Sequence, residues 1–114
     1  MNDTALNKEY LPIDGIPGFN QASQNLIFGA ENEPVKSGRV VTVQALSGTG
    51  SLRIGFEFVN QELPAKVLVS NPTWANHHNV INRAGLSFDQ YPYFDPVTKR
   101  AQIDKLLDYL NNSA

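Results

Sequence analysis

Apolar positions recur along the chain with two different spacings, and together these predict alternating helices and strands. Within residues 19–28 and 51–63 the apolar side chains fall three and four positions apart, which is the spacing of one helix face. The runs 39–46 and 65–70 are short, β-branched and mostly apolar, as is typical of buried strands. Residues 87–94 alternate between two sides, and this alternation predicts a third strand.

Turn and cap residues set the boundaries between these elements. Gly29 stands where the C-cap glycine of the first helix is expected, and residues 31–38 predict a loop. Within residues 71–85, an Asn-Pro turn precedes a helix that we expect to end near the final glycine. The amphipathic pattern within residues 96–112 predicts a closing helix, with Thr98 as a plausible cap before it.

The predicted order of helix, strand, helix, strand, helix, strand, helix indicates an α/β fold. Strands that alternate with helices form mostly parallel sheets, and helices on both faces of such a sheet make three layers. A chain of 114 residues suits one small domain with its own core. Ligands of these sheets bind beyond the carboxyl ends of the strands. Residues 47–51 and 71–78 both follow predicted strands directly, so we expect both at that edge.

Composition excludes several classes of function. The chain is 41% hydrophobic and 18% charged, as expected of a globular protein. A formal net charge of -2 without a Lys/Arg cluster gives no footprint for nucleic acid. The absence of cysteine excludes disulfides, thiolate metal sites and cysteine nucleophiles. No apolar run approaches the ~18 residues of a membrane span. We therefore expect a soluble, intracellular protein without a nucleic-acid or membrane partner.

A segment rich in glycine and hydroxyl side chains lies between the apolar run 39–46 and the next helical pattern. This glycine-rich segment consists of Ser47, Gly48, Thr49, Gly50 and Ser51. A dinucleotide fingerprint would need glycine at Arg53, and a Walker A loop would need lysine at Phe56, so neither nucleotide motif fits. Glycines still allow close backbone approach, hydroxyls donate hydrogen bonds, and a helix N-terminus favours an anion. The residues alone leave two hypotheses: a phosphate site and a plain strand-to-helix turn.

The other segment at this edge carries the single tryptophan of the chain, Trp74, close to Asn76, His77 and His78. A half-buried tryptophan that covers the sheet edge explains Trp74 without any ligand. Neighbouring residues of a helix point about 100° apart, whereas metal-binding histidines usually lie four positions apart, so we expect no metal site. A flat aromatic ring near a phosphate site, however, outlines a site for a planar phosphorylated ring.

Five stretches together carry a resemblance to a known family: NKEYLPIDGIPGFN, LIFGAEN, RVVTVQALSGTGSLRIG, NPTWANHHNVINRAGL and YPYFDPVTK. In this order they resemble aspartate aminotransferase, a fold-type-I, pyridoxal-phosphate-dependent aminotransferase family, and most of all its eukaryotic type. The resemblance covers nearly all of the chain. It implies that residues 1–114 form part of the large, cofactor-binding domain of that fold, that both termini are truncated, and that the cofactor is pyridoxal 5'-phosphate.

The resemblance also implies which residues of this chain bind the cofactor phosphate. Ser47, Gly48 and Thr49 match the family segment that holds the phosphate group. Tyr10, within EYLPI, matches the tyrosine that reaches the phosphate bound by the neighbouring subunit. The glycine-rich segment is then a phosphate site rather than a plain turn.

The same resemblance assigns roles around the cofactor ring. Trp74 matches the tryptophan that stacks on the pyridine ring and lies near a substrate carboxylate. His77 matches the histidine that supports the aspartate partnering the pyridine nitrogen. Asn76 also matches a family position, and we expect it to have a supporting role.

The resemblance implies further groups that this chain does not supply. Transamination needs a lysine that forms a Schiff base with the cofactor and moves a proton. No lysine here has a context like that of the family; the five are Lys8, Lys36, Lys66, Lys99 and Lys105. We therefore expect no catalytic residue in this chain, and expect the ring-binding aspartate and tyrosine and the carboxylate-binding arginines in other segments. Phe56 departs from the family, which usually has a small residue at this position.

These expectations define one function and its alternatives. The main hypothesis is a part of an aspartate aminotransferase that moves an amino group between L-aspartate and 2-oxoglutarate and works as a homodimer. The alternative is a non-catalytic remnant that binds phosphate or a partner subunit, because the lysine is absent. A small nucleotide-binding module is disfavoured by the two motifs that do not fit. We expect a cytoplasmic location and leave a mitochondrial one open.

Overall fold

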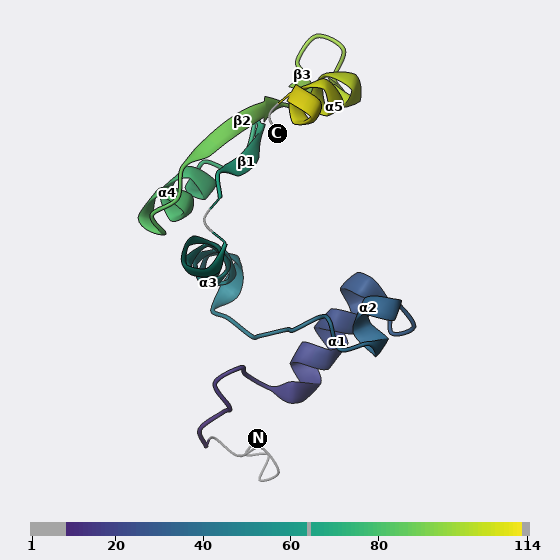
Figure 1. Ribbon diagram of the computed structural model, residues 1–114, viewed down its shortest axis with the longest axis vertical. Coiled ribbons are helices and arrows are strands. Elements are labelled where there is room, and N and C mark those ends of the chain that lie inside the picture. Colours follow the sequence, from purple (N-terminus) through teal and green to yellow (C-terminus); the bar gives the residue numbers. More distant parts are fainter. Residues whose placement is uncertain (1–8, 64, 113–114) are drawn as a thin grey trace, which may run out of the picture. The chain divides into compact units, whose positions relative to one another are not determined.

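The computed structural model describes residues 9–63 and 65–112 (Figure 1). These residues form two compact units, of which the first ends at Leu46 and the second begins at Ser47. The first unit holds two helices, and the second holds the strands and the remaining helices. Among the described residues, no helix is long and apolar enough to cross a membrane.

Helix α1 (Pro17–Phe28) is the main element of the first unit and confirms the first predicted helix. It starts two residues before the predicted boundary, because Pro17 fits the first helical turn, where its missing N–H is not needed. The helix ends as predicted at Gly29, whose φ of 83° is a conformation that glycine adopts without strain. The N–H of Gly29 donates to the carbonyl oxygen of Asn25 at 2.9 Å and closes the last turn.

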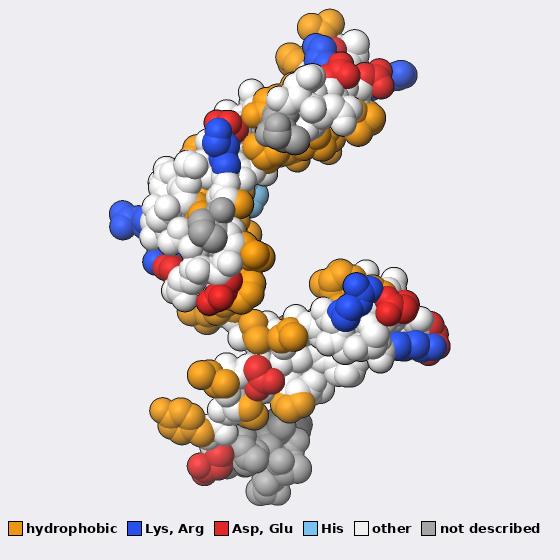
Figure 2. Space-filling view, in the orientation of Figure 1, with side chains coloured by type: hydrophobic (Ala, Val, Ile, Leu, Met, Phe, Trp, Pro, Cys, Tyr) orange, Lys and Arg blue, Asp and Glu red, His pale blue; other side chains and the backbone are white. Residues whose placement is uncertain are grey.

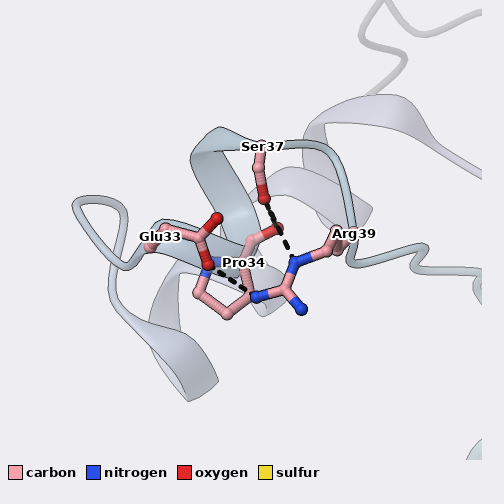
Figure 3. A network of polar contacts seen from close by, with 4 residues as sticks. All are labelled: Glu33, Pro34, Ser37 and Arg39. Carbon is pink, nitrogen blue, oxygen red and sulfur yellow. Dashed lines mark hydrogen bonds and ion pairs between the residues drawn. The ribbon is translucent and has the colours of Figure 1, made fainter.

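The segment predicted as a loop contains a second short helix, α2 (Glu33–Lys36), so the prediction for residues 31–38 was incomplete. Its proline occupies the first turn, and the carbonyl oxygen of Asn32 accepts hydrogen bonds from the next turn. A polar network follows it (Figure 3): Arg39 donates from Nε to Ser37 Oγ at 3.4 Å and pairs with Glu33 at 2.6 Å. Because these side chains are exposed, the network orders the turn after α2 but contributes little stability.

The strand predicted for residues 39–46 is wrong, since the structure assigns no strand there. Val41 and Leu46 are 87% and 88% exposed. A strand needs a ladder of hydrogen bonds to a neighbour. Within residues 40–46, the described part of the chain provides a single backbone hydrogen bond, from Gln44 N–H to the carbonyl oxygen of Asp14 at 2.8 Å. The β-branched composition was read correctly, but the pairing that would make it a strand is not present among the described residues.

The second unit is built on a strand–helix–strand unit that confirms the predicted α/β class. Helix α3 (Ser47–Glu62) leads to β1 (Val67–Asn71), helix α4 (Asn76–Arg83) and β2 (Phe88–Pro92). The two strands pair in parallel over their whole length, from Val67 opposite Phe88 to Asn71 opposite Pro92. In Figure 1 they lie side by side with α4 alongside them. Pro92 is the last residue of its strand, where its missing N–H costs no ladder hydrogen bond.

The core of this unit lies where α3 and α4 meet the strands. Ile81 of α4 is fully buried, and Val69 and Leu86 join it. Four half-buried residues pack against this cluster: Phe56, Val59, Val67 and Phe88. Apolar side chains of α3, α4, the two strands and the turn before β2 therefore meet in one cluster.

The C-terminal part of the unit differs from the sequence prediction. A short antiparallel hairpin, β3 (Phe94–Asp95) with β4 (Arg100–Ala101), precedes helix α5 (Ile103–Asn112). Thr98 is not the helix cap that was predicted, because it lies in the hairpin turn, where its N–H donates to Asp95 Oδ1 at 3.4 Å. The N–H of Val97 donates to the same oxygen at 2.9 Å. The Asp-Pro pair at the start of this stretch favours a turn, and the helix starts only after it.

Candidate functional site

The glycine-rich segment forms the first turn of α3 rather than a loop before it. Ser47 opens the helix with a φ of 58°, a left-handed conformation that is unusual for a residue with a side chain. The helix runs for 16 residues, and its first turn contains no acidic side chain. The first N–H groups of a helix have no partner within the helix and carry its positive end. This end of α3 is therefore suited to an anion.

The side chains of this turn differ in what they can donate. A Cβ added at Gly48 would meet nothing within 4 Å, so a ligand could approach the backbone closely at this position. Ser47 and Thr49 are exposed. The hydroxyl of Ser51 donates to the carbonyl oxygen of Ser47 at 2.9 Å, within the helix itself. The Ser51 hydroxyl therefore already has an acceptor inside the helix, which leaves Ser47 and Thr49 as the hydroxyls better suited to a ligand.

A second group of polar side chains follows the carboxyl end of β1, as predicted for residues 71–78. Trp74 lies in the loop before α4 and is 52% exposed. The N–H of His77 donates to the carbonyl oxygen of Trp74 at 2.9 Å. The two rings stand almost perpendicular, at an interplanar angle of 85° with centroids 5.3 Å apart. The first turn of α4 thus holds the tryptophan and this histidine as one unit with much of the indole surface open.

Thr73 fixes the ring of His77, and this contact was not anticipated from the sequence. Its Oγ1 lies 2.7 Å from His77 Nδ1, a hydrogen bond that sets the orientation of the imidazole and leaves Nε2 for another partner. Thr73 stands four residues before His77, and side chains at this spacing become neighbours at a helix start. That spacing is the signal that would have found it.

The adjacent histidine faces another part of the unit. His78 stacks on Phe88 of β2, with ring centroids 4.4 Å apart and planes only 4° from parallel. Its Nε2 lies 3.2 Å from Gln90 Nε2. The two histidines therefore contact different partners, His77 at the loop and His78 at the second strand. No group of three or more His, Asp or Glu side chains within residues 9–63 and 65–112 could hold a metal ion.

Two separate cavities border some of these residues, and neither is lined by Ser47, Gly48 or Trp74. The first, of about 420 Å³, is lined by residues of α3 and α4: Thr49, Arg53, Asn76, Asn79, Val80 and Arg83. It brings the phosphate-segment threonine and Asn76 to one place, although 27 positions separate them in the sequence. The second, of about 340 Å³, has His77, Thr73 and Phe56 in its wall. Phe56 thus stands in a wall that it shares with the histidine.

Tyr10 belongs to the other compact unit. Its side chain is fully exposed, with a relative accessibility of 103%. It lies shortly before a tight turn at residues 12–15, which the N–H of Gly15 closes by donating to the carbonyl oxygen of Pro12 at 2.9 Å. A tyrosine presented in this way has its hydroxyl free for a partner outside its own unit.

Comparison with known proteins identifies the family. The family described as "Aminotransferase class I and II" matches residues 1–114. The chain belongs to this family. A curated relative named "Aspartate aminotransferase, cytoplasmic", from Dictyostelium discoideum, is 53% identical over 94 residues, which are 81% of this chain and 21% of the relative. Relatives with mitochondrial and chloroplastic names match as well. The chain spans about a quarter of the length of the curated relatives it matches.

Solved structures give the same result for the fold. The cytoplasmic aspartate aminotransferase of Saccharomyces cerevisiae matches with a TM-score of 0.91 and 35% identity, over 98% of this chain and 27% of that chain. An aromatic-amino-acid aminotransferase from Burkholderia pseudomallei, described as covalently bound to pyridoxal phosphate, matches with a TM-score of 0.86 and 41% identity, over 96% and 28% of the two chains. The predicted α/β fold of fold-type-I aminotransferases and the resemblance to aspartate aminotransferase are confirmed.

Proposed function

We propose that this chain supplies the phosphate-binding part of an aspartate aminotransferase, which transfers an amino group between L-aspartate and 2-oxoglutarate with pyridoxal phosphate. One observation carries the proposal. A helix of 16 residues begins with Ser-Gly-Thr and no acid in its first turn, and its Thr49 lines one cavity with Asn76, two residues beyond Trp74. The names of the relatives support the choice of aspartate among amino acids. In this proposal, residues 1–114 are part of the large domain.

The residues of the α3 N-terminus fit a phosphate group. Every group that they offer at this end is a donor: the backbone N–H groups of the first turn and the hydroxyls of Ser47 and Thr49. No carboxylate of the same turn opposes a dianion. Gly48 leaves the space that a Cβ would fill open to the ligand. A dianion gains from the positive end of the helix as well as from these hydrogen bonds.

Trp74 and His77 act on the ring side of the same site. Bound pyridoxal phosphate would supply an aldehyde carbon that takes up and returns the amino group and an electron-poor ring that withdraws negative charge. The exposed indole of Trp74 offers a flat surface against which such a ring packs, near the carboxylate of the substrate. His77 presents Nε2 to the aspartate at the pyridine nitrogen, and Thr73 keeps the imidazole in the required orientation. Asn76 supports this arrangement from the cavity that it shares with Thr49.

Tyr10 completes the phosphate site of a neighbouring subunit in the proposed homodimer. Its full exposure, away from the contacts of its own unit, suits a residue that binds across an interface. The partners of the protein are then a second copy of the chain and its amino-acid and 2-oxo-acid substrates. We place the protein in the cytoplasm, as the Dictyostelium relative is named, although organellar relatives are also similar.

A hybrid enzyme tests this function. The segment of the S. cerevisiae enzyme that matches this chain is replaced by the chain itself, so that all other groups come from an active aminotransferase. We expect the hybrid to retain pyridoxal phosphate and to form oxaloacetate from aspartate and 2-oxoglutarate. The 114-residue chain alone, which lacks the lysine, should give no oxaloacetate above the free-cofactor background. A folded hybrid that neither retains the cofactor nor turns over would refute the proposal.

A further inference from the structure

A tight turn in the first unit is packed directly against one glutamine side chain. Gly15 is buried and has a φ of 96°, so its backbone favours glycine. A Cβ built at this position would lie 2.3 Å from Gln44 Cβ and 2.7 Å from its side-chain oxygen. The side chain of Gln44 therefore occupies the space that any other residue at position 15 would need. The two segments, 29 positions apart in the sequence, are therefore in direct contact.

Hydrogen bonds hold the turn from both sides of this contact. The side-chain oxygen of Gln44 accepts the N–H of Ile16 at 2.9 Å, and the N–H of Gln44 donates to the carbonyl oxygen of Asp14 at 2.8 Å. Asn20 of α1, only 7% exposed, donates from Nδ2 to the same carbonyl at 2.7 Å. Gln44 thus binds the residues directly before and after Gly15. Asn20 of α1 adds a further hydrogen bond to the carbonyl oxygen of Asp14.

Tyr10 protrudes from the segment that leads into this turn. It stands two residues before Pro12, whose carbonyl oxygen closes the turn, and both Tyr10 and Ile13 are fully exposed. Since the ring of Tyr10 is exposed, we take its position to depend on the backbone of the turn that follows it. The segment with Tyr10 is joined to this turn, and Gln44 holds the turn through its hydrogen bonds to Asp14 and Ile16.

We propose that Gln44 is a positioning residue that presents Tyr10 to the cofactor phosphate of the neighbouring subunit. The inference rests on the proposed function, because it takes from it the role of Tyr10. A hydroxyl on a loose segment must give up conformational freedom before it can bind, and a fixed backbone removes part of that cost. Gln44 itself touches neither cofactor nor substrate in this account; it acts through residues 12–16.

Amide exchange in the hybrid enzyme tests whether Gln44 holds the turn. Gln44→Met removes the acceptor at nearly constant volume, whereas Gln44→Glu keeps an oxygen for the N–H of Ile16. We expect the Ile16 amide to exchange about tenfold faster in Gln44→Met and to be restored in Gln44→Glu, as a lost hydrogen bond predicts. The amide of Gly29, which caps α1, is the internal control and should not change. An Ile16 amide that exchanges equally in all three proteins would overturn the inference.

A double-mutant cycle in the hybrid enzyme tests the link to Tyr10. The dissociation constant of pyridoxal phosphate is measured for the unchanged hybrid, Tyr10→Phe, Gln44→Met and the double variant. We expect Gln44→Met to weaken binding about threefold to tenfold when the Tyr10 hydroxyl is present and to have no effect in the Tyr10→Phe background, the signature of coupled residues. Gln44→Glu should restore the affinity.

The outcomes of the cycle separate the two claims. If Tyr10→Phe leaves the affinity unchanged, the proposed role of Tyr10 fails, and the positioning role fails with it. If Tyr10→Phe weakens binding but Gln44→Met weakens it equally in both backgrounds, Gln44 has only a structural role, and this inference alone is overturned.

Discussion

At the residue scale, Trp74 is the side chain whose exposure suits a ligand better than a core. It is 52% exposed and meets His77 edge to face, so its burial contributes less to the fold than that of a core aromatic. His77, in turn, is held by Thr73 through Nδ1. These contacts fix how the imidazole of His77 lies beside the indole of Trp74.

Replacing Trp74 by Ala in the hybrid should weaken cofactor binding and slow turnover together. An aromatic pair contributes about 0.5–1.5 kcal/mol beyond area burial, so we expect an affinity loss of roughly twofold to tenfold. Turnover at saturating cofactor should fall as well, because the indole lies near the substrate carboxylate in the proposed site. Trp74→Phe keeps a flat aromatic face, so its cofactor affinity and turnover should lie between those of Trp74→Ala and the unchanged hybrid. A Trp74→Ala hybrid with unchanged turnover and affinity would show that the tryptophan only covers the sheet edge.

The site residues show what sequence alone can supply at this scale. We expected Thr49 and Asn76 at one sheet edge because each follows a predicted strand. The structure places both in one cavity wall, although the strand predicted before Thr49 does not form. The sequence did not show that the Ser51 hydroxyl donates to the carbonyl oxygen four residues earlier, as a serine inside a helix can. Amino-acid composition does not show whether a hydroxyl donates to the helix backbone or to a ligand.

At the element scale, the spacing of apolar residues and the cap residues predicted those helices and strands that have clear signals within their own sequence. Helices α1, α3 and α4 and the parallel pair β1 and β2 carry their own periodicity and end signals. The run 39–46 has the same β-branched character, yet a strand also needs a partner, and the sequence does not say which segment provides it. The hairpin before α5 was missed because its strands are very short. Its strands have two residues each, too few to show an alternation.

The turn of that hairpin should respond to pH through Asp95. The hydrogen bond from the N–H of Val97, followed by the contacts with Thr98, lowers the pKa of this carboxyl below its usual value. A lowered pKa in the folded state means that the carboxylate stabilises the turn above the unfolded pKa, about 3.9, and that this stabilisation is lost as the pH falls through the folded value. The turn should therefore persist at neutral pH and loosen only in acid.

Nuclear magnetic resonance of the Val97 amide measures this directly. Its chemical shift should titrate with a midpoint below about 3.9, the usual aspartate value. Asp95→Asn keeps an acceptor oxygen without a titrating proton, so its Val97 amide should show no such step. A midpoint at or above the usual value in the unchanged chain would contradict the hydrogen bond seen at 2.9 Å.

At the scale of the whole molecule, many side chains with the pattern of a core remain exposed. On α5, Ile103 and Leu107 are each 52% exposed, and Leu110 is 42% exposed. Figure 2 shows hydrophobic side chains gathered on the surface of this C-terminal region. The amphipathic pattern predicted the helix and its apolar side correctly, but a pattern cannot name the surface that covers that side.

The family assignment supplies what the physical pattern could not. The helix start, the glycines and the tryptophan predicted a site for a phosphorylated planar ring, and the failed nucleotide motifs left its identity open. The match over the whole chain then places the protein in the family of class I and II aminotransferases. The role of Tyr10 depends most on the resemblance, because this residue lies in the other compact unit.

The central claim is that the N-terminus of α3 binds the cofactor phosphate, and Thr49→Ala in the hybrid tests it most directly. A hydrogen bond to a charged group contributes about 1.5–3 kcal/mol, and each 1.4 kcal/mol changes affinity about tenfold. If the N-terminus of α3 binds this phosphate, the dissociation constant for pyridoxal phosphate should rise on the order of tenfold to a hundredfold. Ser51→Ala is the matched control, because the Ser51 hydroxyl already donates to the Ser47 carbonyl and should not affect the cofactor. If Thr49→Ala binds the cofactor as tightly as the unchanged hybrid, the glycine-rich segment is a plain turn and the account is wrong.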